Sequence, residues 1–381
     1  MNVALVFNVK KESTTEVEVI SSPSNPVPLS QSETTPQTEI DSDREGTTRK
    51  VVDESRQGGI FPAILDLYAE WDTQDTIDAV ARALSLCHEV TLVEADENAY
   101  ERLRNGGFDI VFNIAEGMNG VSREAQIPAM LEFLGIPYTG SDPLTLATCL
   151  DKSRTKEILS YHGIPTSRFV VANSFEEAMK TSLRFPLFVK PLHEGSSKGI
   201  YNSSYVESPP ALQREVQRIL NDYSQPALIE EYLPGREFTV ALLGNGNELS
   251  VLPPVEIRFD SLPSEALPVY SYEAKWLWDT KDSPIEVFKC PAPLDDSLRI
   301  KMESVCKKTF ASLKCRDWSR IDVRLDSSGE PNVIEVNPLP GILPDPEEHS
   351  CFPMASRAAG LNYDQMMNAV LDTALRRIGK L

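Results

Sequence analysis

Hydrophobic and polar positions follow a regular pattern near the N-terminus. Short apolar runs at 3–7, 90–94 and 109–114 predict strands, and an amphipathic stretch at 76–86 predicts a helix. Strands and helices that alternate along a chain are typical of a parallel sheet with helices on its faces. The sequence therefore predicts an α/β domain over residues 1–141.

One segment interrupts this pattern. Residues 10–58 are rich in Ser, Thr, Pro and Glu and contain no aromatic residue, so they have too little apolar surface to offset the entropy of ordering. The segment follows the first predicted strand, at the edge where open α/β sheets bind their ligands. We predict a disordered insertion that is either a surface linker, the commoner role of long polar loops, or a lid.

A second unit begins near residue 142. A helical pattern at 144–161 precedes an apolar strand at 185–192, which ends near Lys190 and leads into HEGSSKGI at 193–200. Glycines and serines after a strand can present backbone N–H groups to an anion. The loop lacks the spacing of a P-loop or a dinucleotide-binding turn, and an ordinary hairpin turn explains Gly195 and Gly199 equally well.

The segment ALIEEYLPGREFTVALL at 227–243 contains two further apolar runs with acidic residues near their ends. Glu230, Glu231 and Glu237 could form a solvated rim. A rim is the usual role of acidic residues at a strand end, although one of them could also accept hydrogen bonds from an adenine amino group or from ribose hydroxyls. This segment alone does not decide between the two.

The stretch RIDVRLDSSGEPNVIEVNPLPG at 320–341 predicts an antiparallel hairpin, because a polar turn joins two apolar strands. Residues two apart share a face of a strand, so Arg320 lies beside Asp322 and Glu335 beside Asn337. Two carboxylates and an amide suit Mg²⁺ that also shares substrate phosphates. Arg320 could neutralise a phosphoryl group or an oxyanion. A surface hairpin is the alternative, but its apolar residues favour a sheet.

Composition narrows the function classes. The net charge of −20 argues against nucleic acid or an anionic membrane as partner. The six cysteines show no CxxC pair or zinc spacing and predict reduced thiols. No segment approaches the roughly 18 apolar residues of a membrane span, and no signal-peptide pattern precedes the first strand. These features predict a cytoplasmic protein.

Five motifs in order resemble the ATP-grasp superfamily, and most closely the D-alanine:D-alanine ligase family. They are VKPLHEGSSKG, LIEEYLPGREFTV, YSYEAKW, SRIDVRLDSSGEPNVIEVNPLPG and HSCFPMASRAAG. The resemblance runs from Asp109 to about Leu375. It implies an ATP-grasp fold, of mixed α/β and α+β class, in which a Rossmann-like domain (1–141) precedes a central subdomain (142–229) and a C-terminal subdomain (230–381).

The resemblance also implies a set of site residues. Phosphates of ATP would meet Lys152, Lys190, Lys275 and a loop formed by Glu194, Gly195, Ser196, Ser197 and Gly199. Adenine and ribose would meet Glu230, Glu231, Tyr232, Leu233 and Glu237. Two Mg²⁺ ions, with Mn²⁺ as an alternative, would bind Asp322, Glu335 and Asn337. Catalysis would involve Arg320, Ser196, Lys275 and Gly341, and Ser350 would receive the carboxylate of the second amino acid.

The chain departs from the family pattern at the first amino-acid pocket. Glu116 stands where the family has a histidine. Arg123 begins the segment REAQ at 123–126, which stands where the family pattern has its later acidic residues. Glu70 is a candidate for the glutamate that holds the substrate ammonium. Trp276 replaces the tyrosine that ends the YEAKY loop, which removes a hydroxyl, and Lys198 adds a cation to the glycine loop. These changes disfavour D-alanine as both substrates.

The sequence therefore predicts an ATP-dependent carboxylate–amine ligase that works through an acyl phosphate. It would join amino acids, or an amino acid and an amino-acid-like metabolite. A D-alanine:D-alanine ligase proper, a catalytically inactive nucleotide-binding regulator and a carboxylase or phosphoribosyl-glycinamide-type ligase are the alternatives. The resembled family also suggests a homodimer.

Overall fold

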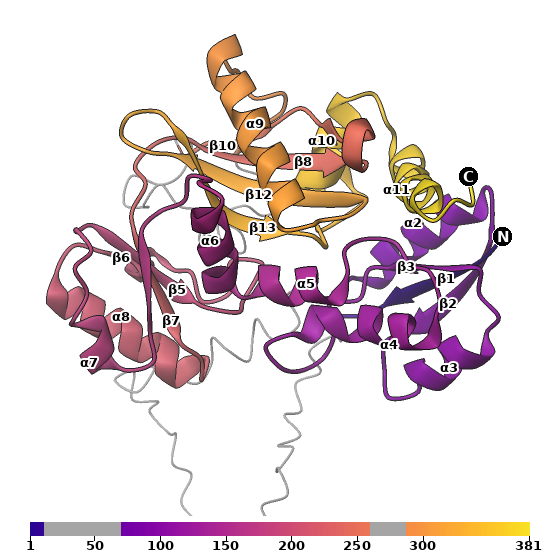
Figure 1. Cartoon of the computed structure of the whole chain (residues 1–381), viewed down its shortest axis with the longest axis horizontal. Helices are drawn as coiled ribbons and strands as arrows, with labels where there is room; N and C mark the ends of the chain where they lie inside the picture. Colours follow the sequence, from indigo (N-terminus) through magenta and orange to yellow (C-terminus); the bar gives the residue numbers. More distant parts are fainter. Residues whose placement is uncertain (11–69, 260–286) are drawn as a thin grey trace, which may run out of the picture. The chain divides into compact units, whose positions relative to one another are not determined.

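The computed structural model describes residues 1–10, 70–259 and 287–381, which Figure 1 shows as labelled ribbons. The strands are β1 (Asn2–Phe7), β2 (Glu89–Glu94), β3 (Ile110–Asn113), β4 (Phe169–Ala172), β5 (Leu187–Pro191), β6 (Tyr205–Val206), β7 (Ala227–Glu231), β8 (Glu237–Leu243), β9 (Ser250–Val251), β10 (Val255–Ile257), β11 (Phe288–Lys289), β12 (Trp318–Leu325) and β13 (Pro331–Asn337). The α-helices are α2 (Gln74–Ser85), α3 (Ala99–Asn105), α4 (Gln126–Leu134), α5 (Pro143–Leu150), α6 (Lys152–Tyr161), α7 (Phe175–Ala178), α8 (Pro209–Asp222), α9 (Asp296–Ser312), α10 (Cys351–Ala358) and α11 (Tyr363–Arg377).

The first sheet is parallel and has the strand order β2-β1-β3. Side chains of β1 alternate between two apolar clusters, as the period of a strand requires. Val3 and Leu5 pack in one cluster with residues of α2 and α11, and Ala4 and Val6 pack in another with residues of α3 and α4. The three strands and the helix predicted near the N-terminus are confirmed, and both faces of the sheet are covered.

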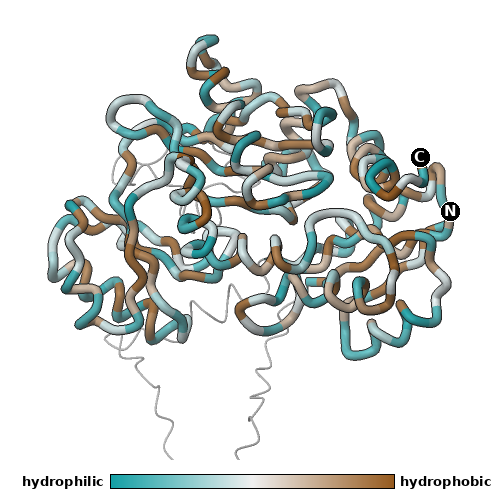
Figure 2. The backbone as a smooth tube through the Cα atoms, in the orientation of Figure 1, coloured by the Kyte–Doolittle hydropathy of each residue, from teal (hydrophilic) through white to brown (hydrophobic). Residues whose placement is uncertain are grey.

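Two antiparallel sheets follow. The smaller has the order β4-β7-β5-β6, and its apolar residues pack with those of α7 and α8. The larger has the order β11-β10-β8-β12-β13, with β9 paired to β8. Met302, Cys306 and Phe310 of α9 pack on one face of this sheet, and Figure 1 shows α9 lying across it. Figure 2 shows hydrophobic segments along the strands and hydrophilic ones at many loops and helix surfaces.

The helical segment predicted at 144–161 is divided into α5 and α6. The break lies at Asp151, whose backbone is extended and whose carboxylate accepts hydrogen bonds from the N–H groups of Ser153 and Arg154. An aspartate in this position caps a new helix. The break makes Lys152 the first residue of α6 and brings it to the region where the two antiparallel sheets meet.

The predicted hairpin is confirmed as β12 and β13. Arg320 pairs with Asn337 and Asp322 with Glu335, and the register then shifts at a β-bulge between Asp322 and Val323. On β12, Ile321, Val323 and Leu325 pack beneath α9, whereas the alternate residues face the opposite side. The pleat of one strand thus separates core residues from candidate site residues.

No helix among the described residues is long and apolar enough to cross a membrane. The domain boundaries near residues 141 and 229 remain predictions. The core that contains Val3 and Leu5 of β1 also contains Trp318 of β12, Phe352 of α10 and Val370 of α11. The last helix of the chain is therefore part of the packing around the first sheet.

Candidate functional site

A cavity of about 900 Å³ is lined by residues from the first sheet's loops and from both antiparallel sheets. The sequence-predicted residues that line it are Glu70, Glu116, Lys152, Lys190, Glu194, Gly195, Ser196, Ser197, Glu230, Glu231, Tyr232, Leu233, Glu237, Arg320, Asp322, Glu335, Asn337, Gly341 and Ser350. Gly199 and Arg123 lie outside the lining. Lys275 and Trp276 lie outside the described residues.

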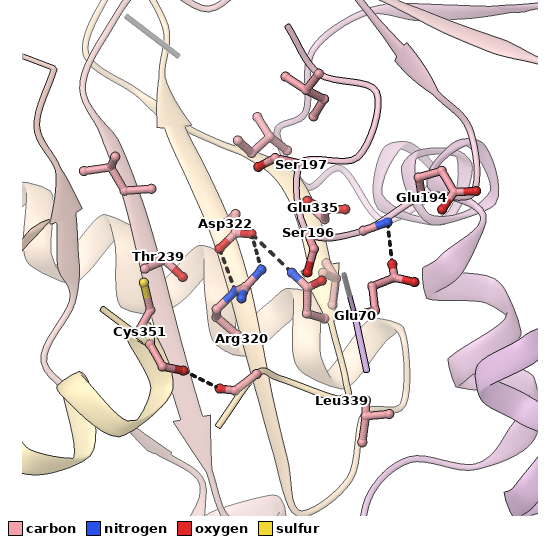
Figure 3. Close-up of a pocket in the computed structure, with 18 of the residues that line it drawn as sticks. Glu70, Glu194, Ser196, Ser197, Thr239, Arg320, Asp322, Glu335, Leu339 and Cys351 are labelled. Atoms are coloured by element: carbon pink, nitrogen blue, oxygen red, sulfur yellow. Dashed lines mark hydrogen bonds and ion pairs between the residues drawn. The ribbon is translucent and has the colours of Figure 1, made fainter. Parts of the chain in front are cut away.

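Arg320 and Asp322 form a bidentate ion pair at one end of the cavity (Figure 3). Nε of Arg320 lies 3.2 Å from Oδ1 of Asp322, and a terminal nitrogen lies 3.0 Å from Oδ2. Asn337 donates a hydrogen bond of 3.2 Å to the same Oδ2. On the neighbouring strand, Glu335 is the cross-strand partner of Asp322, and its Oε1 lies 2.9 Å from Nζ of Lys152. Although burial acts to raise the pKa of Glu335, the charges of Lys152 and Lys190 bring it below its ordinary value.

These residues fit a hard divalent cation. Asp322, Glu335 and Asn337 supply two carboxylates and an amide to one cavity wall, and Mg²⁺ is commonly held by one or two carboxylates together with substrate phosphates. Thr239, the cross-strand neighbour of Asp322, also lines the cavity, and its buried hydroxyl has no hydrogen-bond partner in the described part of the chain. That orphaned oxygen is a further polar group available to a metal-bound water or a ligand.

Glu230 lies between two buried lysines. Its carboxylate is 2.5 Å from Nζ of Lys156 and 2.8 Å from Nζ of Lys190, and Ser167 donates a hydrogen bond of 2.8 Å to it. Burial alone would raise the pKa of Glu230, but the two ammonium groups lower it to about 2. Both carboxylate oxygens are already occupied, so an adenine amino group would have to share one of them.

Glu237 begins β8 opposite Arg324 of β12. Oε2 of Glu237 accepts a hydrogen bond of 2.7 Å from Arg324, which also donates to the hydroxyl of Tyr232 at 2.7 Å. All three residues line the cavity. The residues predicted to meet the ribose and the adenine edge are therefore joined through an arginine that the sequence did not single out.

The glycine and serine loop after β5 has an unusual backbone. Ser196 and Ser197 have φ angles of 50° and 60°, in the left-handed region that non-glycine residues rarely adopt and that is enriched at functional sites. Nζ of Lys152 donates to the carbonyl of Glu194. A Cβ on Gly199 would lie 2.4 Å from Pro191, so glycine is required there by packing. The loop is not the ordinary hairpin turn that its sequence also allowed.

Glu70 is already neutralised by two cations. Arg123 donates to both of its oxygens at 3.1 and 2.9 Å, Lys198 lies 3.0 Å from Oε2, and the N–H of Gly195 lies 2.8 Å from Oε1. Figure 3 shows Glu70 bonded to the loop. Burial acts to raise the pKa of Glu70, but Arg123 and Lys198 lower it overall. Glu70 is thus a link to the glycine loop, and its capacity to hold a substrate ammonium is largely used.

Three other carboxylates of the cavity have no such partners. The side chains of Asp72, Glu116 and Glu124 form no hydrogen bond or ion pair within the described segments. Burial raises the pKa of Asp72 to about 7. Burial, with the charge of Glu70, raises the pKa of Glu124 to about 8, and burial with the charge of Glu124 raises that of Glu116. This part of the cavity therefore favours a bound cation.

Ser350 lies just before α10 and is 8% exposed. Its hydroxyl donates a hydrogen bond of 2.9 Å to the carbonyl of Gly341. Gly341 lies in the segment that follows β13. The two residues predicted to handle the second amino acid and the reaction intermediate are therefore in direct contact, and both line the same cavity as Arg320.

Two antiparallel sheets that share a cavity lined by lysines, a glycine loop and a carboxylate hairpin form the architecture of an ATP-grasp ligase, and the solved structures that match confirm this predicted fold class. A family model described as "D-ala D-ala ligase C-terminus" matches residues 157–372. The chain therefore belongs to the D-alanine–D-alanine ligase family, as its motifs predicted.

Individual relatives support this assignment to the family. The chain is 38% identical to "Uncharacterized protein y4sG" of Sinorhizobium fredii, over 81% of this chain and 89% of that protein. It is 34% identical to a D-alanine–D-alanine ligase of Alcanivorax borkumensis, over 79% of this chain and 87% of that protein. The crystal structure of the D-alanine–D-alanine ligase of Bacillus anthracis matches with a TM-score of 0.63 and 26% identity, over 81% of this chain and 95% of that one.

Three residues were missed from the sequence: Arg324 and Glu124, which line the cavity, and Lys156, which contacts the cavity residue Glu230. Lys156 occurs in LDKSRTK, one helical turn beyond Lys152, and that i, i+4 spacing was a usable signal. Arg324 shares a strand face with Arg320 and Asp322, so the alternation that identified those two also includes it. Glu124 had no comparable signal, because it lies in the segment where the chain departs from the family pattern.

Proposed function

We propose that this protein is an ATP- and Mg²⁺-dependent ligase that joins a carboxylate to an amine through an acyl phosphate. The proposal rests mainly on one observation. Two of the three lysines predicted to meet ATP phosphates, Lys152 and Lys190, line one cavity together with the carboxylates predicted to hold metal and the arginine predicted to stabilise the intermediate. Lys152, Glu335, Arg320, Asp322 and Asn337 are joined there by direct contacts in two groups.

The chemistry has two steps. A carboxylate resists attack by an amine, so its oxygen first attacks the γ-phosphorus of ATP, which forms a mixed anhydride and releases ADP. The amine then attacks the acyl carbon, and phosphate leaves as the amide bond forms and the amine loses a proton. Mg²⁺, when bound, would neutralise phosphate charge in such a transfer.

The chain's own residues would position and screen the reactants. Lys152 and Lys190 are buried cations at the wall of the cavity, and they would hold phosphate oxygens as ATP enters. Arg320 would face the negative charge that develops on the tetrahedral intermediate. The 194–199 loop would limit the access of water to the acyl phosphate. Gly341 and Ser350 would bind the second substrate close to Arg320.

The first substrate would be an amino acid whose ammonium is held by Glu116 and Glu124. This assignment differs from the one expected for Glu70, which is occupied by Arg123 and Lys198. The carboxyl groups of Glu116 and Glu124 have raised pKa values in the ligand-free protein, and cationic nitrogens bound beside them would favour their ionised, negatively charged forms. A substrate with a second amino group would match that charge better than D-alanine does. We therefore propose an amino acid or amino-acid-like compound that carries more than one cationic nitrogen.

A screen of substrate pairs tests this function. Purified protein would be incubated with ATP, Mg²⁺ and pairs of amino acids, with and without additional amino groups, and both ADP and the product mass would be measured. We expect ADP release to depend on an amino-acid pair and not on bicarbonate. If no pair raises ADP release above the control without substrate, the ligase proposal fails for that set.

A D-alanine–D-alanine ligase proper is the second candidate, because a relative with that name is 34% identical to the chain. The same screen separates the two, since this candidate requires turnover with D-alanine alone. A nucleotide-binding regulator would bind ATP without releasing ADP in any mixture. The homodimer and the cytoplasmic location remain predictions.

A further inference from the structure

Arg324 is a buried cation that the proposed chemistry does not use. It lies on β12, on the same strand face as Arg320 and Asp322, and it lines the cavity although the residue is only 5% exposed. Charged side chains are almost never buried to this extent unless they are paired. The contacts that Arg324 makes therefore indicate its role in the site.

Two partners of Arg324 are residues predicted to surround the nucleoside, Glu237 and Tyr232. One terminal nitrogen of Arg324 donates to Oε2 of Glu237 at 2.7 Å, and the other donates to the hydroxyl of Tyr232 at 2.7 Å. The guanidinium also lies over the Tyr232 ring, 4.8 Å from its centroid. A planar guanidinium with several donors in fixed directions holds both partners in one geometry, which a lysine could not do.

This arrangement leaves one side of Glu237 available. Oε2 is bonded to Arg324, whereas Oε1 has no partner among the residues that the structure describes, and Glu237 lines the cavity. Burial raises the pKa of Glu237 overall, and the charge of Arg324 opposes that rise. Arg324 thus favours a carboxylate that is ionised, oriented and able to accept one more hydrogen bond.

We propose that Arg324 is a positioning residue that fixes Glu237 as an acceptor for a ribose hydroxyl, and that the pair selects ATP over an analogue that lacks that hydroxyl. The inference rests on the proposed function, in which Glu237 holds the ribose of ATP. It adds a residue to that site and a property, sugar selectivity, that can be measured by binding alone.

The larger sheet offers a matched control. Arg236 and Glu256 form a similar ion pair, with contacts of 2.6 and 2.8 Å, and Arg236 lies 4.9 Å from the centroid of the Phe238 ring. Neither Arg236 nor Glu256 lines the cavity. Loss of Arg236 removes an arginine–glutamate pair and an aromatic contact from the sheet without touching the nucleoside site.

The experiment is calorimetric titration of ATP, 2′-deoxy-ATP and 3′-deoxy-ATP, each with Mg²⁺, into the full chain. We expect the unmodified protein to prefer ATP about tenfold or more over at least one deoxy analogue, because a hydrogen bond to a charged group is lost. Arg324→Met should weaken the binding of ATP about tenfold, because the acceptor for the hydroxyl is no longer held in place. It should change the affinity for that deoxy analogue by no more than about twofold, so that the preference for ATP disappears. Arg236→Met should keep the preference.

Equal weakening of all three nucleotides by Arg324→Met would overturn the inference and make Arg324 a purely structural residue. Arg324→Lys, which keeps a positive charge in the buried position, carries the same test if Arg324→Met does not fold. Its preference for ATP should also fall, because one ammonium cannot hold both partners. If the unmodified protein binds no nucleotide, the proposed function fails together with this inference. If it binds all three equally, only this inference fails.

Discussion

The ammonium of Lys152 lies 2.9 Å from a carboxylate oxygen of Glu335. Lys152 begins α6 and Glu335 lies on β13, so this contact joins the central segment of the chain to the carboxylate hairpin. The same ammonium also donates to the carbonyl of Glu194 in the glycine loop. One lysine therefore connects three parts of the candidate site, and its loss should affect both nucleotide binding and turnover.

Lys152→Met should raise the KM for ATP by about tenfold or more and lower kcat, because a buried cation for the phosphates is removed and Glu335 loses its partner. Steady-state ADP release would measure both constants. Lys301→Met is the matched control, since Lys301 forms an ion pair with Glu330 at exposed positions. An unchanged KM in Lys152→Met would contradict a phosphate-binding role.

Asp322→Asn and Glu335→Gln should each reduce kcat by about a hundredfold or more while the protein stays folded, because each removes a charged oxygen from the predicted Mg²⁺ site. Both variants should need a higher concentration of Mg²⁺ for half-maximal activity. Glu330→Gln, in the turn of the same hairpin, should behave as the unmodified protein does. Near-normal turnover in both cavity variants would show that Asp322 and Glu335 do not hold the metal ion.

Glu230 should make the folded state sensitive to acid. Its pKa is about 2 in the folded protein and 4.5 ordinarily, so its contribution to stability is present above about pH 4.5 and is lost as the pH falls toward 2. Glu230→Gln should cost roughly 3 kcal/mol or more at pH 7, since two buried lysines lose their partner. Urea unfolding at pH 7, 5 and 3 should show this difference narrowing with acid. A difference that does not change with pH would refute the assignment.

Glu124 should have the opposite dependence on pH. Its pKa is raised from 4.5 to about 8, so ionisation destabilises the folded state progressively as the pH rises through that interval. Glu124→Gln should therefore stabilise the ligand-free protein by roughly 4 kcal/mol at pH 8.5 and by roughly 1 kcal/mol at pH 5. Glu101→Gln, at an exposed position of α3, is the control. Equal effects at both pH values would argue against a buried, unpaired carboxyl group.

The sequence predicted the hairpin geometry well because that geometry depends on the two-residue period of its strands. Arg320, Asp322, Glu335 and Asn337 were placed by the two-residue period of strands and by an evident turn, and the structure pairs them as expected. The bulge beyond Asp322 was not predicted, since nothing in VIEVN distinguishes a bulged strand from a regular one.

Long-range ion pairs were beyond sequence reasoning. Glu70 meets Arg123 and Lys198 across separations of 53 and 128 residues, and no local pattern encodes which of several acids will receive those cations. The division at Asp151 had a signal, an aspartate before a helical segment, but the continuous helical pattern on both sides concealed it. Local periodicity therefore identified the elements, and three-dimensional packing determined which charges remain unpaired.

The alternation along β12 also constrains how this chain can evolve. Arg320, Asp322 and Arg324 face the cavity while the intervening residues fill the core. Insertion or deletion of a single residue before Arg320 in β12 would reverse this parity and exchange all three polar side chains with Ile321, Val323 and Leu325. Natural selection can act on single substitutions along β12 one at a time. An insertion or deletion of one residue keeps the parity only if a second one compensates for it or if a β-bulge accommodates it. A fixed length of β12 should therefore be inherited together with this wall of the cavity, even where individual residues differ.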